Sequence, residues 1–166
     1  MGDFRINQHG WTKIFYVTAT TNDENSPERQ YSVGDFRINK EESMSEEQQK
    51  LVYILHDAGE RAEKVLTAFA VANIGLSMEH DITIILFGEA TRLAYKGYAE
   101  TVHSLDRLPL DRLMGDFLDN GGKIWVCLPC IKSRKVDPSM LVDGVEATTG
   151  TVVNDIFIEA DKVIGW

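Results

Sequence analysis

The sequence predicts an α/β fold for residues 49–166, a three-layer α/β/α sandwich with a mainly parallel sheet of about five strands. Short apolar runs rich in β-branched and aromatic residues alternate with helical stretches, at spacings typical of βαβ units. The runs are apolar at successive positions, as expected of strands that are covered on both faces. A chain of 166 residues, 43% of them hydrophobic, is long enough to close one substantial core.

Four apolar runs and one weaker run account for the predicted strands. In chain order they are LVYIL (51–55), ITIILF (82–87), KIWVC (123–127), the weaker GVEATT (144–149) and KVIGW (162–166). Because a crossover between parallel strands is right-handed, the helices that join these runs are expected to pack back onto the sheet.

The first helical stretch, residues 60–78, spaces its apolar side chains at i, i+3 and i+4 with one polar break at Asn73. Its remaining face is rich in alanine, so we expect this helix to be largely buried. Shorter helical pieces are expected at 89–96, 111–119 and 151–160, with a turn opened by Pro138. An Asn-Gly-Gly stop signal follows the second of these pieces.

Residues 1–48 form an N-terminal extension of different composition, with polar and acidic stretches. Two stretches with strand-like alternation, 13–18 and 31–39, predict a hairpin, which must dock on something because an isolated hairpin is marginal in water. Met44 would serve as a natural start to the domain, so an appended, partly disordered tail is the alternative. The string GDFRIN occurs twice, but two copies of six residues do not make a solenoid.

The composition narrows the class of partner. A formal net charge of −9 argues against nucleic acid and against an anionic membrane surface, both of which require a basic footprint. No run of 18 apolar residues is present and the amino terminus lacks a signal-peptide profile, so we expect a cytoplasmic protein. Proteins and small molecules remain as partners.

Ligands of an open parallel sheet gather outside the carboxyl ends of its strands. His56 and Asp57 follow the first predicted strand, Gly88 and Glu89 the second, and Cys127–Cys130 the third. The first pair could act as acid and base or could serve only in a turn. The second pair could line a site or could serve as a turn glycine and a helix-start carboxylate.

Cys127 ends the third predicted strand, and basic residues follow it: Lys132, Arg134 and Lys135. If Cys130 opens a helical turn, backbone N–H groups and these cations would stabilise a thiolate on Cys127, and a persulfide in the same way. The alternatives are that Cys127 is a small buried hydrophobe and that Cys130 is a helix-face residue without a role rather than a resolving thiol.

The sequence supports no cofactor and no metal site. It contains no G-x-G-x-x-G after a strand and no P-loop. A structural zinc site needs four ligands, whereas the chain has one C-x-x-C and four scattered histidines. A metal shared between subunits has no support either.

The domain resembles the DsrE/DsrF-like sulfur-relay proteins, which include the TusD-type subunits. The resemblance is carried by the His-Asp-x-Gly-Glu-Arg loop, by GLSMEHD before ITIILFGEATRLAYKG, by LMGDFLDNGGKIWVCLPCIKSRKV and by EADKVIGW. It implies a sulfurtransferase-like carrier that accepts sulfur from a donor on Cys127 and passes it to an acceptor. It also implies assembly as a homotrimer or hexamer. Arg134 matches the family's spacing, whereas Lys135 stands where glycine is usual.

Three functional hypotheses follow from the sequence. The leading one is sulfur transfer through a Cys127 persulfide, whose donor and acceptor are proteins or small sulfane-sulfur compounds. The second is a thiol–disulfide redox protein, in which Cys127 and Cys130 cycle through a disulfide. The third is a non-enzymatic subunit that binds a ligand or partner at the strand ends.

Overall fold

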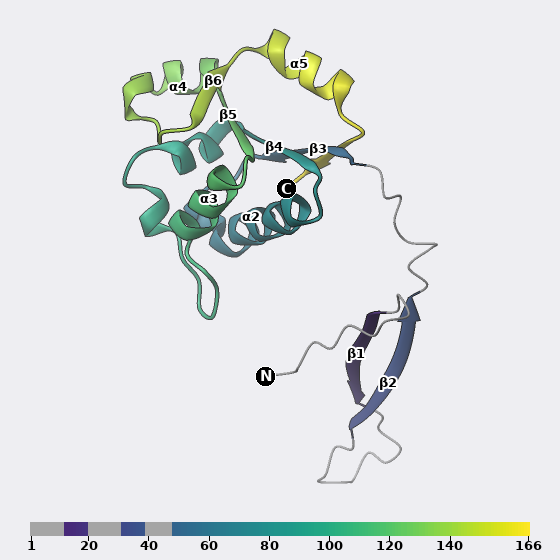
Figure 1. The fold of residues 1–166 in the computed structure, drawn as a ribbon. Coiled ribbons are helices and arrows are strands. Elements are labelled where there is room, and N and C mark those ends of the chain that lie inside the picture. Colours follow the sequence, from purple (N-terminus) through teal and green to yellow (C-terminus); the bar gives the residue numbers. More distant parts are fainter. Residues whose placement is uncertain (1–11, 20–30, 39–47) are drawn as a thin grey trace. The chain divides into compact units, whose positions relative to one another are not determined.

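The computed structural model describes residues 12–19, 31–38 and 48–166. The chain divides into two units, Met1–Glu47 and Gln48–Trp166. In the first unit, β1 (Thr12–Ala19) and β2 (Tyr31–Ile38) pair antiparallel over their full lengths (Figure 1). The expected start at Met44 and the first GDFRIN copy lie outside the described residues, and the docking of the hairpin stays a prediction.

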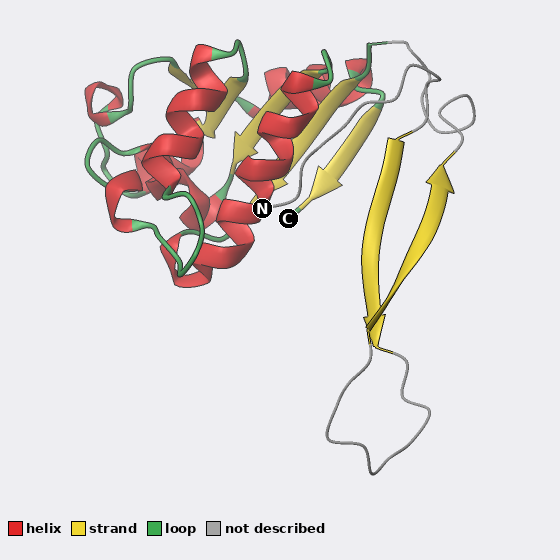
Figure 2. Ribbon diagram, turned by 60° about the horizontal axis from the view of Figure 1, so that its bottom comes forward, coloured by secondary structure: helices red, strands yellow, loops and turns green. Residues whose placement is uncertain are grey.

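The second unit contains a five-stranded sheet whose neighbouring strands are all parallel, which confirms the predicted fold class (Figure 2). The strands are β3 (Lys50–Leu55), β4 (Asp81–Leu86), β5 (Lys123–Cys127), β6 (Val145–Thr148) and β7 (Lys162–Gly165), in the order β6-β5-β4-β3-β7. Five consecutive side chains of the central strand β4 are buried. A strand covered on both faces therefore reads as a continuous apolar run.

The helical elements follow the predicted order with small shifts at their ends. They are η1 (Gly59–Arg61), α2 (Ala62–Ser77), η2 (Gly88–Ala94), η3 (Ala99–Thr101), α3 (Leu110–Asp119), α4 (Leu128–Ser133), η4 (Pro138–Met140) and α5 (Gly150–Glu159). The helical piece predicted at 89–96 is present as a 3-10 helix that begins at Gly88 and ends at Ala94. Within the described residues, no helix is long and apolar enough to cross a membrane.

The main core lies between the sheet and α2 and α3, which cover the same face (Figure 1). Phe69 of α2 and Phe117 of α3 are fully buried and meet edge to face, with their ring centroids 6.1 Å apart. Asn73, the polar break of α2, uses its side-chain amide to donate to the carbonyls of Phe69 and Leu113, at 3.1 and 2.9 Å. The break in the apolar pattern is therefore a hydrogen-bonded link between the two helices.

The opposite face of the sheet carries a smaller apolar cluster under α5. Its buried members are Val52, Ile85 and Val153. Because the chain leaves β6 at one edge of the sheet and returns to β7 at the other, α5 crosses this second face and completes the third layer.

The end of α3 shows how the chain turns back into the sheet. Gly121 has a φ of 86°, and its N–H donates to the carbonyl of Leu118, while the N–H of Gly122 donates to the carbonyl of Phe117. These two bonds form a Schellman motif, in which the residue after the C-cap takes the left-handed conformation that glycine adopts freely. The Asn-Gly-Gly stop signal is confirmed.

Candidate functional site

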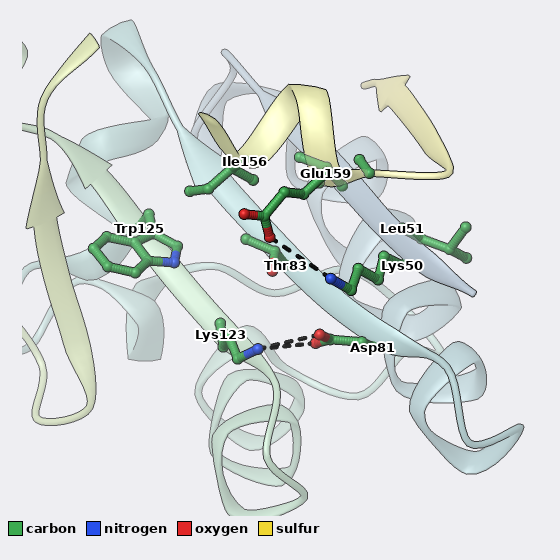
Figure 3. Close-up of a pocket in the computed structure, with 10 residues that line it drawn as sticks. Lys50, Leu51, Asp81, Thr83, Lys123, Trp125, Ile156 and Glu159 are labelled. Carbon is green, nitrogen blue, oxygen red and sulfur yellow. Dashed lines mark hydrogen bonds and ion pairs between the residues drawn. The ribbon is translucent and has the colours of Figure 1, made fainter. Parts of the chain in front are cut away.

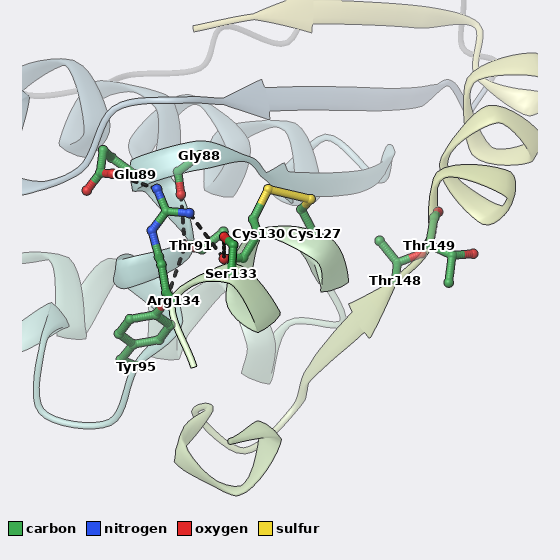
Figure 4. Close-up of a disulfide and its surroundings, with 10 residues drawn as sticks. All are labelled: Gly88, Glu89, Thr91, Tyr95, Cys127, Cys130, Ser133, Arg134, Thr148 and Thr149. Carbon is green, nitrogen blue, oxygen red and sulfur yellow. Dashed lines mark hydrogen bonds and ion pairs between the residues drawn. A yellow bond between two sulfur atoms is a disulfide. The ribbon is translucent and has the colours of Figure 1, made fainter. Parts of the chain in front are cut away.

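Cys127 and Cys130 form a disulfide at the carboxyl end of β5 (Figure 4). Cys127 is the last residue of the strand and the N-cap of α4, and Cys130 lies in the first turn of that helix. Their Cα atoms are 5.2 Å apart, within the range that disulfides span. The strand-to-helix turn therefore brings the only two cysteines of the chain together.

Both cysteines are half-buried, while the side chains on either side of them in the chain form part of the core. Val126 precedes the pair and Ile131 follows it, and both are fully buried. The core contacts of these neighbours fix the backbone at each end of the turn. The backbone around the two sulfur atoms is consequently fixed by the core, while the cysteines themselves are partly exposed to solvent.

Two helices begin next to Cys127. Pro129 occupies the second position of α4 and has no N–H, so Leu128 and Cys130 supply the free amides of that helix start. Cys127 pairs with Thr148 of β6, and α5 begins two residues further along. The amide ends of both helices favour negative charge in this region.

Arg134, at the end of α4, donates to a carboxylate oxygen of Glu89 at 2.6 Å and to the carbonyl of Cys130 at 3.1 Å (Figure 4). Glu89 also pairs with Arg92 at 3.6 Å. The hydrogen bond and the charge of Arg134 lower the pKa of Glu89 below its ordinary value. Arg134 therefore pairs with Glu89, and its contact with the cysteine turn is with a carbonyl, so its expected role beside a Cys127 thiolate stays a prediction.

The turn after α4 has the same hydrogen bonds as the turn after α3, but with lysine in the left-handed position. The N–H of Lys135 donates to the carbonyl of Lys132, and the N–H of Val136 donates to the carbonyl of Ile131. Lys135 has a φ of 55°, a conformation that costs a non-glycine residue about 1–2 kcal/mol. This position therefore requires the backbone that glycine takes most easily.

His56 and Gly88 lie where the exit loops of β3 and β4 meet. The amide of Ala90 donates to the carbonyl of His56 at 3.1 Å, and the His56 ring stacks on Phe87 with 5.6 Å between centroids. Gly88 has a φ of 53°, which explains the choice of glycine in this turn. The hydroxyl of Thr91, which is fully buried, donates to the Gly88 carbonyl at 2.9 Å and so stabilises the turn.

Asp57 faces α2 instead of the cysteines. Its carboxylate accepts a hydrogen bond from Lys64 at 2.6 Å and lies 3.9 Å from Arg61. The hydrogen bond from Lys64, followed by the charges of Lys64 and Arg61, lowers the pKa of Asp57. Since β4 separates β3 from β5, the structure groups Gly88, Glu89 and Arg134 with the cysteines and leaves Asp57 apart.

The sequence profile of the DsrE/DsrF-like family matches residues 49–166, which is the whole second unit apart from its first residue. The chain belongs to the DsrE/DsrF-like family. An uncharacterized protein of Methanocaldococcus jannaschii, MJ0760, is 31% identical over 96 residues, which cover 57% of this chain. The match spans about a third of the length of that relative, 35%.

Solved structures support the same fold for this DsrE-like unit. The ychN protein from E. coli superposes with a TM-score of 0.62 at 20% identity, over 72% of this chain and 100% of that one. MTH1491 from Methanobacterium thermoautotrophicum superposes with a TM-score of 0.54 at 13% identity, over 72% of this chain and 100% of that one. BT1422 from Bacteroides thetaiotaomicron superposes with a TM-score of 0.53 at 16% identity, over 71% of this chain and 95% of that one. The last two are described as proteins of unknown function.

A second feature of the DsrE-like unit lies at the amino ends of β3, β4 and β5, where a pocket of about 320 Å³ opens beside α5 (Figure 3). Lys50 pairs with Glu159 at 3.6 Å and Lys123 pairs with Asp81 at 3.1 Å along its walls. Trp125 contributes its ring. The lining contains no cysteine and no histidine, and its charges are matched in pairs.

Sequence reasoning missed two threonines near the cysteine pair. Thr148 becomes a neighbour of Cys127 only through the β5–β6 register, and Thr91 only through the 3-10 geometry of η2. Thr148 belongs to the weaker strand predicted at 144–149, but the strand order that sets it beside β5 was not predictable from the sequence. Among residues 48–166, no group of three His, Cys, Asp or Glu side chains is arranged to hold a metal ion.

Proposed function

We propose that this DsrE-like chain carries sulfane sulfur as a persulfide on Cys127 and passes it to a partner. The observation that carries the proposal is a half-exposed cysteine at the carboxyl end of a central strand, beside two helix starts that favour an anion. DsrE-family proteins generally take part in sulfur relay. A persulfide is an anion at neutral pH, so the groups that favour a thiolate also favour the loaded form.

The transfer steps conserve electrons. The Cys127 thiolate attacks the outer sulfur of a donor persulfide, a new S–S bond forms, and the donor leaves as a thiolate. An acceptor thiolate then attacks the outer sulfur on Cys127, and the Cys127 thiolate is the leaving group. Donor and acceptor are proteins or small sulfane-sulfur compounds, and a reducing compartment such as the cytoplasm would keep the cysteine pair available as thiols.

The proposal includes assembly as a homotrimer or hexamer and retains His56, Asp57, Gly88, Glu89 and Arg134 as residues that shape the donor site. Sedimentation of the full chain measures the assembly directly. A monomer at micromolar concentration would remove the assembly from the proposal without touching the sulfur chemistry.

Intact-mass measurement tests sulfur transfer. The reduced full chain is incubated with glutathione persulfide and transferred to buffer free of donor. Cys130→Ser is expected to gain one sulfur atom, and Cys127→Ser none, because only the second variant lacks the acceptor. Absence of added sulfur on Cys130→Ser, with wild-type folding shown by circular dichroism, would contradict the proposal.

Thiol–disulfide exchange is the second candidate function, and the Cys127–Cys130 disulfide favours it. Titration against glutathione redox buffers would then give a reversible mass change of two hydrogen atoms that needs both cysteines. If alkylation shows both thiols to be unreactive at neutral pH, neither function holds and a binding role remains.

A further inference from the structure

We infer that Cys130 attacks the Cys127 persulfide, so that the chain releases the carried sulfur as hydrosulfide and closes its own disulfide. The inference rests on the proposed function, because sulfur must first be loaded on Cys127. It adds an activity to a carrier: reduction of sulfane sulfur to sulfide, with the cysteine pair as the source of two electrons.

The geometry of the pair supports the attack. The disulfide joins Cys130 to the sulfur of Cys127, with 5.2 Å between the Cα atoms. That Cys127 sulfur is the inner sulfur of the proposed persulfide. The backbone that holds the disulfide therefore already places Cys130 where it must be to displace the outer sulfur.

The turn that carries the attacking thiol is held in place by several contacts. The carbonyl of Cys130 accepts hydrogen bonds from the Ser133 hydroxyl at 2.9 Å and from Arg134 at 3.1 Å. Ile131, the next residue, is fully buried. Because the turn is fixed on both sides, attack within the chain has a large advantage over attack by a dissolved thiol.

The released sulfur has a route to solvent. Cys127 stays half-exposed even in the disulfide form, and Pro129, two residues along the chain, and Thr149, next to its strand partner Thr148, are exposed. Hydrosulfide is small and charged, so it leaves readily into water. A partner thiolate can reach the same exposed sulfur, and transfer and release then compete for one loaded state.

The step balances in atoms and electrons. Cys130 loses its proton to solvent, its thiolate forms a bond to the Cys127 sulfur, and the S–S bond of the persulfide breaks. The bonding electron pair leaves with the outer sulfur, which takes up one proton from solvent, in place of the one that Cys130 gave up, and departs as hydrosulfide. The outer sulfur is reduced by two electrons and the cysteine pair is oxidised to the disulfide. A dithiol reductant then restores the pair.

A single-turnover experiment tests the inference with one equivalent of glutathione persulfide per chain and no other reductant present. Wild type is expected to release one sulfide per chain and to lose two hydrogen atoms in intact mass. Cys130→Ser is expected to keep one added sulfur atom and to release sulfide about a hundredfold more slowly, since the intramolecular attacker is missing. Cys130→Ala provides a second variant, and circular dichroism confirms folding of both.

The other outcomes separate the inference from the proposed function. A wild-type chain that holds its added sulfur, with Cys130 still open to alkylation, would overturn the release step and leave the carrier intact. If Cys130→Ser and Cys130→Ala both stay unloaded, the proposed function fails. A glutathione adduct on either variant in place of one sulfur atom would show attack on the inner sulfur of the donor, and would overturn both.

Discussion

At the carboxyl edge of the sheet lie two half-buried cysteines joined in a disulfide, with one arginine tied to the carbonyl beside them. At the amino edge lies a pocket of about 320 Å³ whose two lysines are each paired with a carboxylate. This pocket therefore lies at the edge without a cysteine, and the cysteines lie at the opposite ends of the strands.

This contrast follows from the topology of a parallel sheet. The carboxyl ends of the strands open into loops and helix starts, which bring amide groups to the sulfur atoms. At the amino ends, the charged side chains that line the pocket pair with one another, and the lining contains no cysteine. We therefore assign the chemistry to the edge with the cysteines. Of four predictions, the first two test that choice, and the other two test the stability of the surrounding turns and ion pairs.

The largest expected effect separates the two edges directly. Cys127→Ser is expected to reduce sulfur uptake to background, because the acceptor atom is absent. Lys123→Ala, at the amino-edge pocket, is expected to leave uptake unchanged. Both are measured by intact mass after incubation with glutathione persulfide. Uptake that depends on Lys123 instead of Cys127 would move the site to the pocket.

The second effect concerns the hydrogen bond from Arg134 to the cysteine turn. Arg134→Ala is expected to slow closure of the disulfide by up to about tenfold, because the carbonyl of Cys130 loses a charged donor and the turn becomes less well placed. Stopped-flow measurement of oxidation gives the rate. Lys132→Ala, an exposed residue of the same helix, is the matched control. Equal slowing in both variants would point to loss of positive charge or of helix α4 rather than of the contact.

The third effect compares the turns after α3 and α4, which share their hydrogen bonds. Lys135→Gly is expected to raise the free energy of unfolding by about 0.5–1 kcal/mol, because glycine adopts the left-handed backbone without steric cost. Gly121→Ala is expected to lower it by about 1 kcal/mol, since its surroundings are open and only the backbone resists. Urea unfolding measures both. Two changes of the same sign would contradict this account.

The smallest effect is a pH dependence at Glu89. Its pKa is lower in the folded chain than its ordinary value, chiefly through the hydrogen bond from Arg134. The stabilising contribution is therefore complete above the ordinary pKa of glutamate and is lost as the pH falls through the folded pKa. The difference in unfolding free energy between wild type and Glu89→Gln should shrink from neutral to acidic pH. A difference that grows in acid would have the wrong sign.

Much of the fold could be predicted because each strand is a continuous apolar run. The strand predicted at 123–127 has the observed bounds, and the weaker run at 144–149 is present as Val145–Thr148. The predicted helix at 60–78 begins later, because a 3-10 turn precedes Ala62. Periodicity does not distinguish the first turn of an α-helix from a 3-10 turn.

The candidate site was predictable only to the level of strand ends. Cys127 and Cys130 were found because they close one predicted strand. The pairing of Arg134 with Glu89, 45 residues away, depends on how η2 packs against α4, which no local pattern encodes. The left-handed backbone at Lys135 could not be predicted either, since lysine rarely adopts this conformation.

The central claim is that sulfur resides on Cys127, and peptide-level mass spectrometry of the loaded protein tests it most directly. Loaded Cys130→Ser is alkylated under mild conditions, digested and fragmented across the turn from Cys127 to Lys132. The account predicts one additional sulfur atom between the alkyl group and Cys127. Alkylated Cys127 without added sulfur, or added sulfur found only on Cys130 when Cys127→Ser is loaded, would contradict it.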